Sequence, residues 1–325
     1  MEGNIRELVG EVKARNAKRV LVQVPDGLLW KTQEILDALY AAGIQAFMSL
    51  EPCYGACDLR DVEAERLGCD LLVNVGHSDF GVDEKIPTLY FIWKVDVDVM
   101  PALEKEWQKL DEYKNIGLVS SVNFLHILPA VQKFLESKGK TALIGKGSLM
   151  SGQVLGCNVS SALVIDRNVD AFLFVGSGQF HPLGIGLRLE KPFFVLDVER
   201  GEISRPDYSL FERQRYAAIA KAEEANDFAI LVSTKPGQHF VDPFMMKERL
   251  EALGKRAWIF TLDLVLPERL EGVHADCYVN TACPRITVEN RTAFRKPLLN
   301  PDEFAELMRN LERISQASNP AKINI

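Results

Sequence analysis

The segment Arg19-Val-Leu-Val-Gln-Val24, followed by the turn Pro25-Asp-Gly27, begins the unit that the rest of the chain repeats. A short run rich in β-branched residues is typical of a strand that is buried in a parallel sheet. A helical pattern follows over 30–42 and ends at Gly43, because glycine commonly terminates helices. A second apolar strand then runs over 44–50. This order of strand, helix and strand predicts a parallel βαβ unit.

The same layout recurs twice more, marked by three sets of residues that appear in a fixed order. Each copy has a glycine where a helix ends, an aspartate where a strand begins and a proline that introduces a further strand, at spacings of roughly 95–115 residues. The three sets are Gly43, Gly139 and Gly254; Asp70, Asp170 and Asp276; and Pro87, Pro192 and Pro297.

The repeat predicts an α/β fold with three homologous αβα domains, each built on a small, mostly parallel sheet. We expect a pseudo-threefold arrangement of these domains around a central cleft. The predicted domains are residues 1–113, 114–207 and 208–325, with linking helices over 101–113 and 208–226.

Composition excludes several classes of protein. Hydrophobic residues make up 47% of the chain and charged residues 26%, which is ordinary for a soluble globular protein. The net charge of −7 argues against nucleic-acid binding, since phosphate contacts need clustered Lys and Arg. No apolar run approaches the roughly 20 residues that span a bilayer, and the polar amino terminus is unlike a signal peptide. We therefore expect a cytoplasmic protein without nucleic-acid or membrane partners.

The six cysteines fall into two groups. Cys69 stands just before a predicted strand and Cys277 within one, so both are expected to be core thiols. The other four occur in loops after predicted strands, and open α/β sheets bind ligands in loops of this kind. They are Cys53, Cys57, Cys157 and Cys283.

Three of these loop cysteines are distributed one per predicted domain. Cys57 and Cys157 follow the second strand of their domains, whereas Cys283 follows the third strand of the last domain. Thiolates that converge on one cleft suit a soft metal or an iron–sulfur cluster. A structural zinc site is less favoured, because such sites usually take a Cys-x₂-Cys pair from one tight turn. Plain burial of Cys53 and Cys57 in a turn remains an alternative.

The motif cysteines stand in three segments, Gly55-Ala-Cys-Asp58, Gly152-Gln-Val-Leu-Gly-Cys157 and Thr281-Ala-Cys-Pro-Arg-Ile286. These segments resemble the three cluster motifs of a known family, the archaeal diphthamide synthases or 2-(3-amino-3-carboxypropyl)histidine synthases. The likeness extends through Val24-Pro-Asp-Gly27, His77-Ser78 and Gly176-Ser-Gly-Gln-Phe-His-Pro182, and covers essentially the whole chain.

The resemblance implies that Cys57, Cys157 and Cys283 ligate a 4Fe–4S cluster. It also implies that S-adenosylmethionine is the cosubstrate, that a histidine of elongation factor 2 is the acceptor, and that the reaction is the first step of diphthamide biosynthesis. Such noncanonical radical enzymes break the bond from sulfur to the methionine γ-carbon, and the resulting 3-amino-3-carboxypropyl radical adds to the imidazole C2 carbon. A homodimer and an external electron donor are likewise implied.

The residues that would hold S-adenosylmethionine are harder to predict. Backbone amides at strand-to-helix junctions are candidates because they bind anions, although ordinary turn chemistry explains the same residues equally well. The histidines His77 and His181 stand in equivalent predicted loops and are further candidates to face the cleft, although a loop histidine that only caps or hydrogen-bonds is an equally good interpretation. Whether Cys53 has a role stays open. The candidates for cosubstrate binding are Asp26, Gly27, Ser177, Gly178, Gln179 and Gln238.

Two alternatives to the transferase remain. A 4Fe–4S dehydratase or condensing enzyme of the quinolinate synthase type also places one cysteine in each of three similar domains. A non-catalytic scaffold subunit could retain the fold. The presence of all three motif cysteines argues against the scaffold, and the loop sequences favour the diphthamide synthase.

Overall fold

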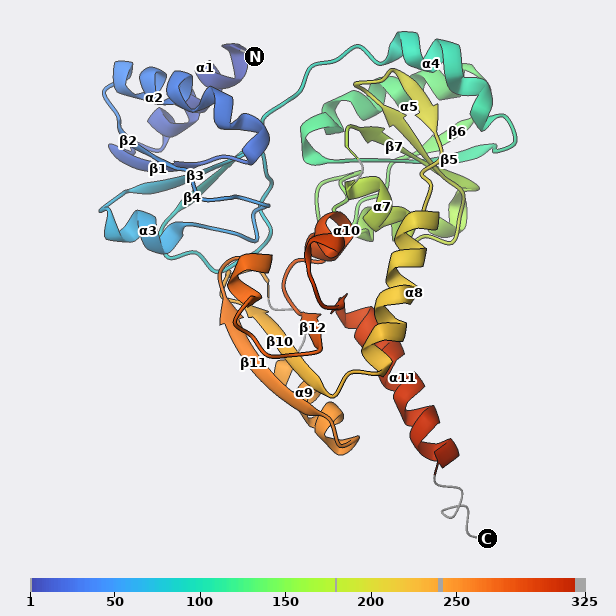
Figure 1. The fold of residues 1–325 in the computed structure, drawn as a ribbon. Coiled ribbons are helices and arrows are strands. Elements are labelled where there is room, and N and C mark those ends of the chain that lie inside the picture. Colours follow the sequence, from blue (N-terminus) through green and yellow to red (C-terminus); the bar gives the residue numbers. More distant parts are fainter. Residues whose placement is uncertain (1, 179, 239–241, 319–325) are drawn as a thin grey trace. The chain divides into compact units, whose positions relative to one another are not determined.

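The computed structural model describes residues 2–178, 180–238 and 242–318. These residues form three separate small sheets with helices packed against them (Figure 1). The chain divides into two compact units, Met1–Pro206 with the first two sheets and Asp207–Ile325 with the third. The predicted α/β class with three mostly parallel sheets is confirmed. The three predicted domain boundaries and the pseudo-threefold arrangement stay predictions.

The first sheet has the strand order β2-β1-β3-β4, and all of its strands run parallel. Helices α1 and α2 pack on one face through residues such as Leu8 and Ile35, while α3 packs on the other through Ala64 (Figure 1). The elements are α1 (Glu2–Ala14), β1 (Arg19–Gln23), α2 (Thr32–Ala41), β2 (Gln45–Ser49), α3 (Asp61–Arg66), β3 (Leu71–Val75) and β4 (Thr88–Phe91).

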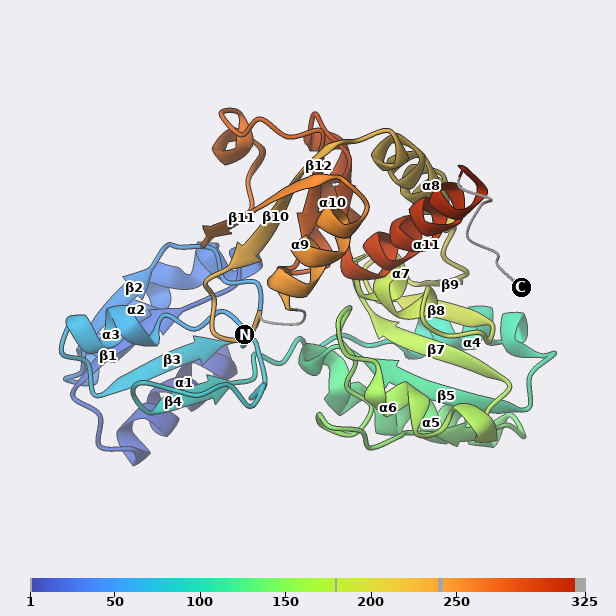
Figure 2. The same cartoon turned by 90° about the horizontal axis from the view of Figure 1, so that it is seen from below.

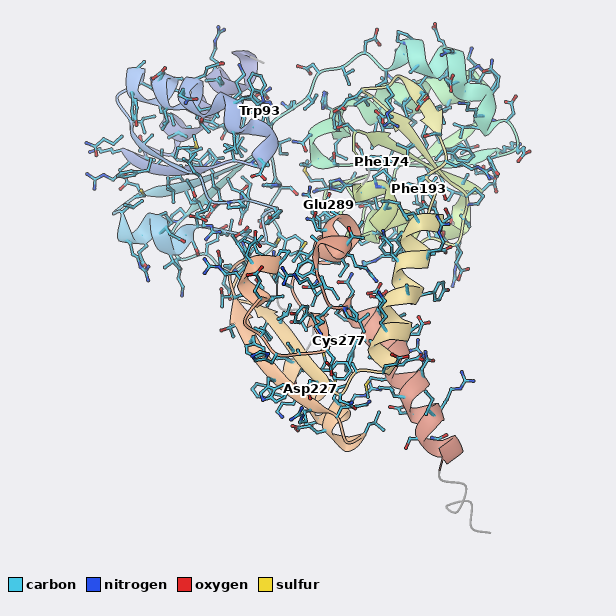
Figure 3. All side chains as sticks on the ribbon, viewed as in Figure 1. Trp93, Phe174, Phe193, Asp227, Cys277 and Glu289 are labelled. Atoms are coloured by element: carbon cyan, nitrogen blue, oxygen red, sulfur yellow. The ribbon has the colours of Figure 1, made fainter. Side chains whose placement is uncertain are left out.

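The second sheet repeats this order and adds one antiparallel edge strand, β9, that the sequence did not predict. Helices α4 and α5 cover one face, and α6 and α7 cover the other. Phe174 and Phe193 lie in the core of this second face (Figure 3). The elements are α4 (Met100–Glu106), β5 (Asn115–Ser120), α5 (Leu128–Ser137), β6 (Thr141–Leu143), α6 (Ser160–Leu163), β7 (Ala171–Gly176), α7 (Phe180–Gly186), β8 (Phe193–Asp197) and β9 (Glu202–Ser204).

The third sheet has the order β11-β10-β12-β13 and is again parallel. Helices α8, α9 and α11 share one core against it, and α8 and α11 lie side by side in both views (Figures 1 and 2). The elements are α8 (Ser209–Glu223), β10 (Asp227–Ser233), α9 (Pro243–Ala252), β11 (Arg256–Leu262), β12 (Cys277–Asn280), α10 (Arg285–Asn290), β13 (Leu298–Leu299) and α11 (Pro301–Ser318).

The three marker glycines end their helices in the same way. Gly43, Gly139 and Gly254 follow α2, α5 and α9 with φ angles of 78°, 79° and 76°. Each donates its amide to the carbonyl three residues earlier at 2.9 Å, and the next amide bonds to the carbonyl five residues back. This Schellman geometry requires a left-handed residue, which glycine adopts without strain.

The three marker aspartates also occupy equivalent places, directly before β3, β7 and β12. Each carboxylate accepts two backbone N–H bonds, at 2.7–3.1 Å, from the residues at the start of β1, β5 or β10. These bonds lower the pKa of Asp70 and of Asp276. The predicted placement of the glycines and aspartates is therefore confirmed at the level of individual contacts.

Two predicted α-helices are partly replaced by 3₁₀ helices in the structure. The helix predicted over 30–42 is α2, which begins only at Thr32, because residues 30 and 31 belong to the 3₁₀ segment η1 (Asp26–Lys31). The helix predicted over 101–113 consists of α4 and the 3₁₀ segment η2 (Trp107–Leu110). Short 3₁₀ segments commonly occur at helix ends and as connectors. The others are η3 (Val122–Ile127), η4 (Asp166–Asn168), η5 (Pro267–Leu270) and η6 (Arg291–Ala293). Within the described ranges, no helix is both long and apolar enough to cross a membrane.

Candidate functional site

Burial separates the six cysteines into two groups of three. Cys53, Cys69 and Cys277 are buried, whereas Cys57, Cys157 and Cys283 are partly exposed. Cys277 lies inside β12 (Figure 3).

Burial also changes the acidity of the hidden thiols. It raises the pKa of Cys53 to about 12 and raises the pKa of Cys277 as well. Thiols buried in this way are usually structural and chemically inert. The three partly exposed cysteines are those that the sequence predicts as ligands. Two of them belong to the first unit and one to the second, and within the described residues neither unit shows three His, Cys, Asp or Glu side chains gathered around a metal site.

The loop that carries Cys57 follows β2 and is held by Gln23 from the neighbouring strand β1. The Gln23 side-chain amide donates to Cys53 Sγ at 2.9 Å and to the Asp58 carbonyl at 2.7 Å. Its oxygen accepts the backbone N–H of Arg60 at 2.8 Å. Gln23 is fully buried. The sequence analysis missed this residue, although a glutamine within an otherwise apolar strand is a signal that could have found it.

The loop that carries Cys157 is attached to the carboxyl end of β5. Ser120 donates its amide to the Gly152 carbonyl and accepts the amide of Val154, both at 2.9 Å. Further along, Arg188 donates to the carbonyl of Cys157 at 2.9 Å. Burial raises the pKa of Cys157, while the Arg188 charge acts in the opposite direction.

A close backbone contact fixes the same loop from the other side. A Cβ atom on Gly184, in α7, would lie 2.9 Å from the Gly156 Cα atom. Only a glycine in α7 therefore lets the backbone of this loop pack so tightly against the helix.

The loop that carries Cys283 follows β12 and is held by Asn280, which is fully buried. The Asn280 side chain accepts the Ala282 amide at 3.1 Å, and donates to the Cys283 carbonyl at 3.0 Å and to Asn300 at 2.9 Å. Asn300 in turn donates its backbone N–H to Glu303 at 2.8 Å. A polar network thus connects this cysteine loop to the start of α11.

The His77-Ser78 segment contacts two of these features. His77 Nδ1 lies 2.8 Å from Asn74 Oδ1 and 3.9 Å from Cys53 Sγ. Ser78 exchanges hydrogen bonds of 2.7 and 3.0 Å with the side chain of Gln153, in the Cys157 loop. His181 differs from its expected loop position, because it lies in α7 with its ring stacked on that of Phe174.

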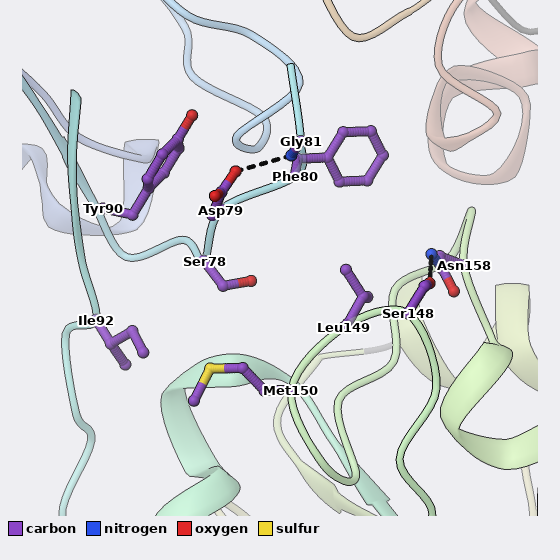
Figure 4. Close-up of a pocket in the computed structure, with 10 residues that line it drawn as sticks. All are labelled: Ser78, Asp79, Phe80, Gly81, Tyr90, Ile92, Ser148, Leu149, Met150 and Asn158. Carbon is purple, nitrogen blue, oxygen red and sulfur yellow. Dashed lines mark hydrogen bonds between the residues drawn. The ribbon is translucent and has the colours of Figure 1, made fainter. Parts of the chain in front are cut away.

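A cavity of about 630 Å³ opens beside Ser78 in the first unit (Figure 4). Binding pockets for small molecules usually measure roughly 300–1,000 Å³. Asn158, which directly follows Cys157, is at one side and donates to Ser148 at 3.0 Å. The lining residues are Ser78, Asp79, Phe80, Gly81, Tyr90, Ile92, Ser148, Leu149, Met150 and Asn158.

The predicted cosubstrate residues lie elsewhere. Asp26 and Gly27 begin η1 after β1, and Ser177 and Gly178 follow β7. Gln238 is buried in the second unit, and its backbone N–H donates to the Lys235 carbonyl at 3.2 Å. Gln179 lies outside the described residues. None of the described candidates lines the cavity, and their assignment to S-adenosylmethionine stays a prediction.

Comparison with known proteins gives one consistent result. The family model described as "Putative diphthamide synthesis protein" matches residues 24–318. A Pyrococcus horikoshii protein named 2-(3-amino-3-carboxypropyl)histidine synthase is 36% identical over 310 residues, covering 93% of this chain and 89% of that protein. The Homo sapiens protein named subunit 1 of this synthase is 28% identical over 325 residues, covering 94% of this chain and 72% of that protein. A crystal structure of Dph2 from Pyrococcus horikoshii with a 4Fe-4S cluster matches with a TM-score of 0.85 and 34% identity, covering 94% of this chain and 90% of that one.

Proposed function

The chain belongs to the family of diphthamide synthesis proteins, and from this premise we propose that it is a 2-(3-amino-3-carboxypropyl)histidine synthase. The transferred group is the 3-amino-3-carboxypropyl group of S-adenosylmethionine. The acceptor is C2 of a histidine imidazole in elongation factor 2, and the reaction is the first step of diphthamide biosynthesis.

The observation that carries this proposal is the exposure of the cysteines. Cys57, Cys157 and Cys283 stand in the three motifs and are also the three cysteines that remain partly exposed. Thiolates are the usual ligands of 4Fe–4S clusters, so the donor set fits such a cluster. Each thiol follows the carboxyl end of a strand, in a loop whose backbone is hydrogen-bonded to a neighbouring element.

A bound cluster would supply one electron from an external donor and an iron with an open coordination position. The protein would bind and orient S-adenosylmethionine so that the bond from sulfur to the γ-carbon breaks. Backbone amides at Asp26, Gly27, Ser177 and Gly178 are our candidates to hold the anionic carboxylate. Gln179 and Gln238 complete the proposed set. The cysteine loops would fix where the reacting atoms meet.

The ligand assignment can be tested by iron and sulfide analysis after anaerobic reconstitution. Cys57→Ala, Cys157→Ala and Cys283→Ala should each lose most of the bound iron, because each removes a proposed ligand. Cys277→Ala is the matched control, since its thiol is buried in β12, and should reconstitute normally. A Cys57→Ala protein with a full complement of iron would show that the ligand set is wrong.

The activity can be tested by chromatography of the nucleoside products. Reduced, cluster-loaded protein should convert S-adenosylmethionine to 5′-methylthioadenosine, since cleavage at the γ-carbon leaves the methyl group on the adenosine side. Elongation factor 2, when added, should gain one 3-amino-3-carboxypropyl group on a single histidine, detected by peptide mass spectrometry. If 5′-deoxyadenosine dominates, or nothing forms with an intact cluster, the proposal is wrong.

The proposed assembly is a homodimer that works in the cytoplasm with a separate reductant. The support is the family membership, because the relatives cover nearly the whole chain. Light scattering of the purified protein tests the dimer, and a monomeric mass at micromolar concentration would contradict it.

A further inference from the structure

The side chain of Gln23 contacts the Cys57 loop on both sides of the cysteine. On the amino side its amide nitrogen donates to Cys53 Sγ at 2.9 Å. On the carboxyl side the same nitrogen donates to the Asp58 carbonyl at 2.7 Å, and its oxygen accepts the Arg60 amide at 2.8 Å. Three of the hydrogen-bonding positions of one side chain are thus used by one eight-residue segment, 53–60.

An apolar residue would be the ordinary choice at this position. Gln23 is the last residue of β1, which has parallel strands on both sides, and it is fully buried. Burying an amide is unfavourable unless its polar atoms are bonded. Because the Cys57 loop supplies those partners, the amide is satisfied only when the loop has the conformation seen here. A glutamine at this point therefore selects one loop geometry.

The same contacts explain why Cys53 is a cysteine. Its thiol is buried and accepts one of the two Gln23 donor bonds. A cysteine suits this buried position because its side chain is small and its sulfur is a weak acceptor for the Gln23 amide. Cys53 therefore anchors the beginning of the loop, and its thiol is not among the proposed ligands.

We infer that Gln23 and Cys53 form a positioning pair that holds Cys57 in the place needed for ligation. The inference rests on the proposed function for the identity of the bound group, and it adds the residues that make the first ligand rigid. Groups that orient ligating residues typically change metal affinity by about 10–100-fold when they are replaced.

The test compares Gln23→Met with a matched control, Asn4→Leu. Methionine keeps the length of glutamine but makes none of its three bonds. Asn4 is also a buried amide of the first unit. Among the described residues, its side chain hydrogen-bonds in both directions to the Lys94 backbone, at 2.9 and 3.1 Å, and to no residue of a cysteine loop. Both variants should lower the melting temperature of the apoprotein. Only Gln23→Met should lose iron faster.

Iron release is measured on the cluster-loaded full chain with a ferrous chelator and neither substrate present. We expect Gln23→Met to release iron about 10-fold faster than wild type or more, with Asn4→Leu at the wild-type rate. Cys53→Ala deletes one contact and leaves the other two, so it should still bind a cluster and release iron at an intermediate rate. It also provides the test if Gln23→Met does not fold.

Two results would overturn the inference. One is a Gln23→Met protein that retains iron as wild type does while its melting temperature falls like that of Asn4→Leu, since Gln23 would then serve only the fold. The other is wild-type iron release from Cys53→Ala. Neither result bears on the transferase, whereas a wild-type chain that binds no cluster would remove the proposed function itself.

Discussion

Replacing Arg291 by methionine should destabilise the third sheet much less than replacing its partner Glu303 by methionine. The two side chains form a buried ion pair. The Glu303 carboxylate also accepts a hydrogen bond from the backbone N–H of Asn300 at 2.8 Å, and its Oε1 atom lies 3.9 Å from Arg215 Nε. Arg291 has fewer partners, because its Nε and Nη1 atoms are buried without a hydrogen bond among the residues that the structure describes.

The magnitudes follow from this asymmetry. Without Glu303 a guanidinium that cannot lose its proton is left buried, which costs about 3–5 kcal/mol. Removing Arg291 forfeits the pair but also removes the two buried nitrogens, Nε and Nη1, that lack a hydrogen bond within the described structure. Each such nitrogen is unfavourable by about 1–3 kcal/mol. The remaining carboxyl can also take up a proton, since burial already raises the pKa of Glu303. The expected net loss for Arg291→Met is about 1 kcal/mol.

Hydrogen exchange of the apoprotein, followed by mass spectrometry, measures the difference locally. Because 1.4 kcal/mol corresponds to a factor of ten, amides of β12 should exchange about a hundredfold faster in Glu303→Met than in Arg291→Met. Amides of β7, in the first unit, serve as the internal control and should not change. Equal effects of the two substitutions, or a larger effect of Arg291→Met, would refute this account of the pair.

Two further predictions concern the repeat and the Cys157 loop. Asp70→Ala should cost about 1 kcal/mol at pH 7, after allowance for solvent screening of an exposed carboxylate. Hydrogen bonds from backbone amides lower the pKa of Asp70 in the folded state. The contribution of Asp70 is therefore present above the unfolded pKa and is lost as pH falls through the folded value. Urea denaturation should show the unfolding free energies of wild type and variant converging at acidic pH, and a constant difference would contradict the prediction. Gly184→Ala would place a Cβ 2.9 Å from Gly156 Cα. It should lower the free energy of unfolding by about 1–3 kcal/mol and weaken iron binding, as measured by thermal unfolding and iron analysis. Gly10→Ala, in α1 with open space around it, is its control and should be neutral or stabilising.

The repeat could be predicted from the sequence because its markers meet local demands. A helix that ends in the left-handed conformation requires a residue such as Gly43. An aspartate such as Asp70 supplies a carboxylate to the adjacent strand start wherever the same βαβ unit is formed. These demands do not depend on where the other domains lie, so they are visible as a pattern in one chain.

The remaining features depend on residues that are brought together only by folding. Gln23 stands out as a polar residue in an apolar strand, but its partner, the Asp58 carbonyl, lies 35 positions away and cannot be identified from a local pattern. The three-residue strand β9 exists because it pairs with the edge of β8. The burial of Cys53 likewise follows from the packing of its loop on β1, which the spacing of cysteines does not reveal.

The aspartate contacts all occur at the amino ends of the sheets, whereas the cysteine loops leave the carboxyl ends. Each domain therefore has one end shaped by the demands of folding and another shaped by chemistry. Heat resistance and reactivity can accordingly be adjusted by separate sets of substitutions. A variant library confined to the amino ends should yield proteins with higher melting temperatures that still bind iron. The same number of substitutions at the carboxyl ends, where the cysteine loops lie, would gain stability only by reducing iron binding or activity.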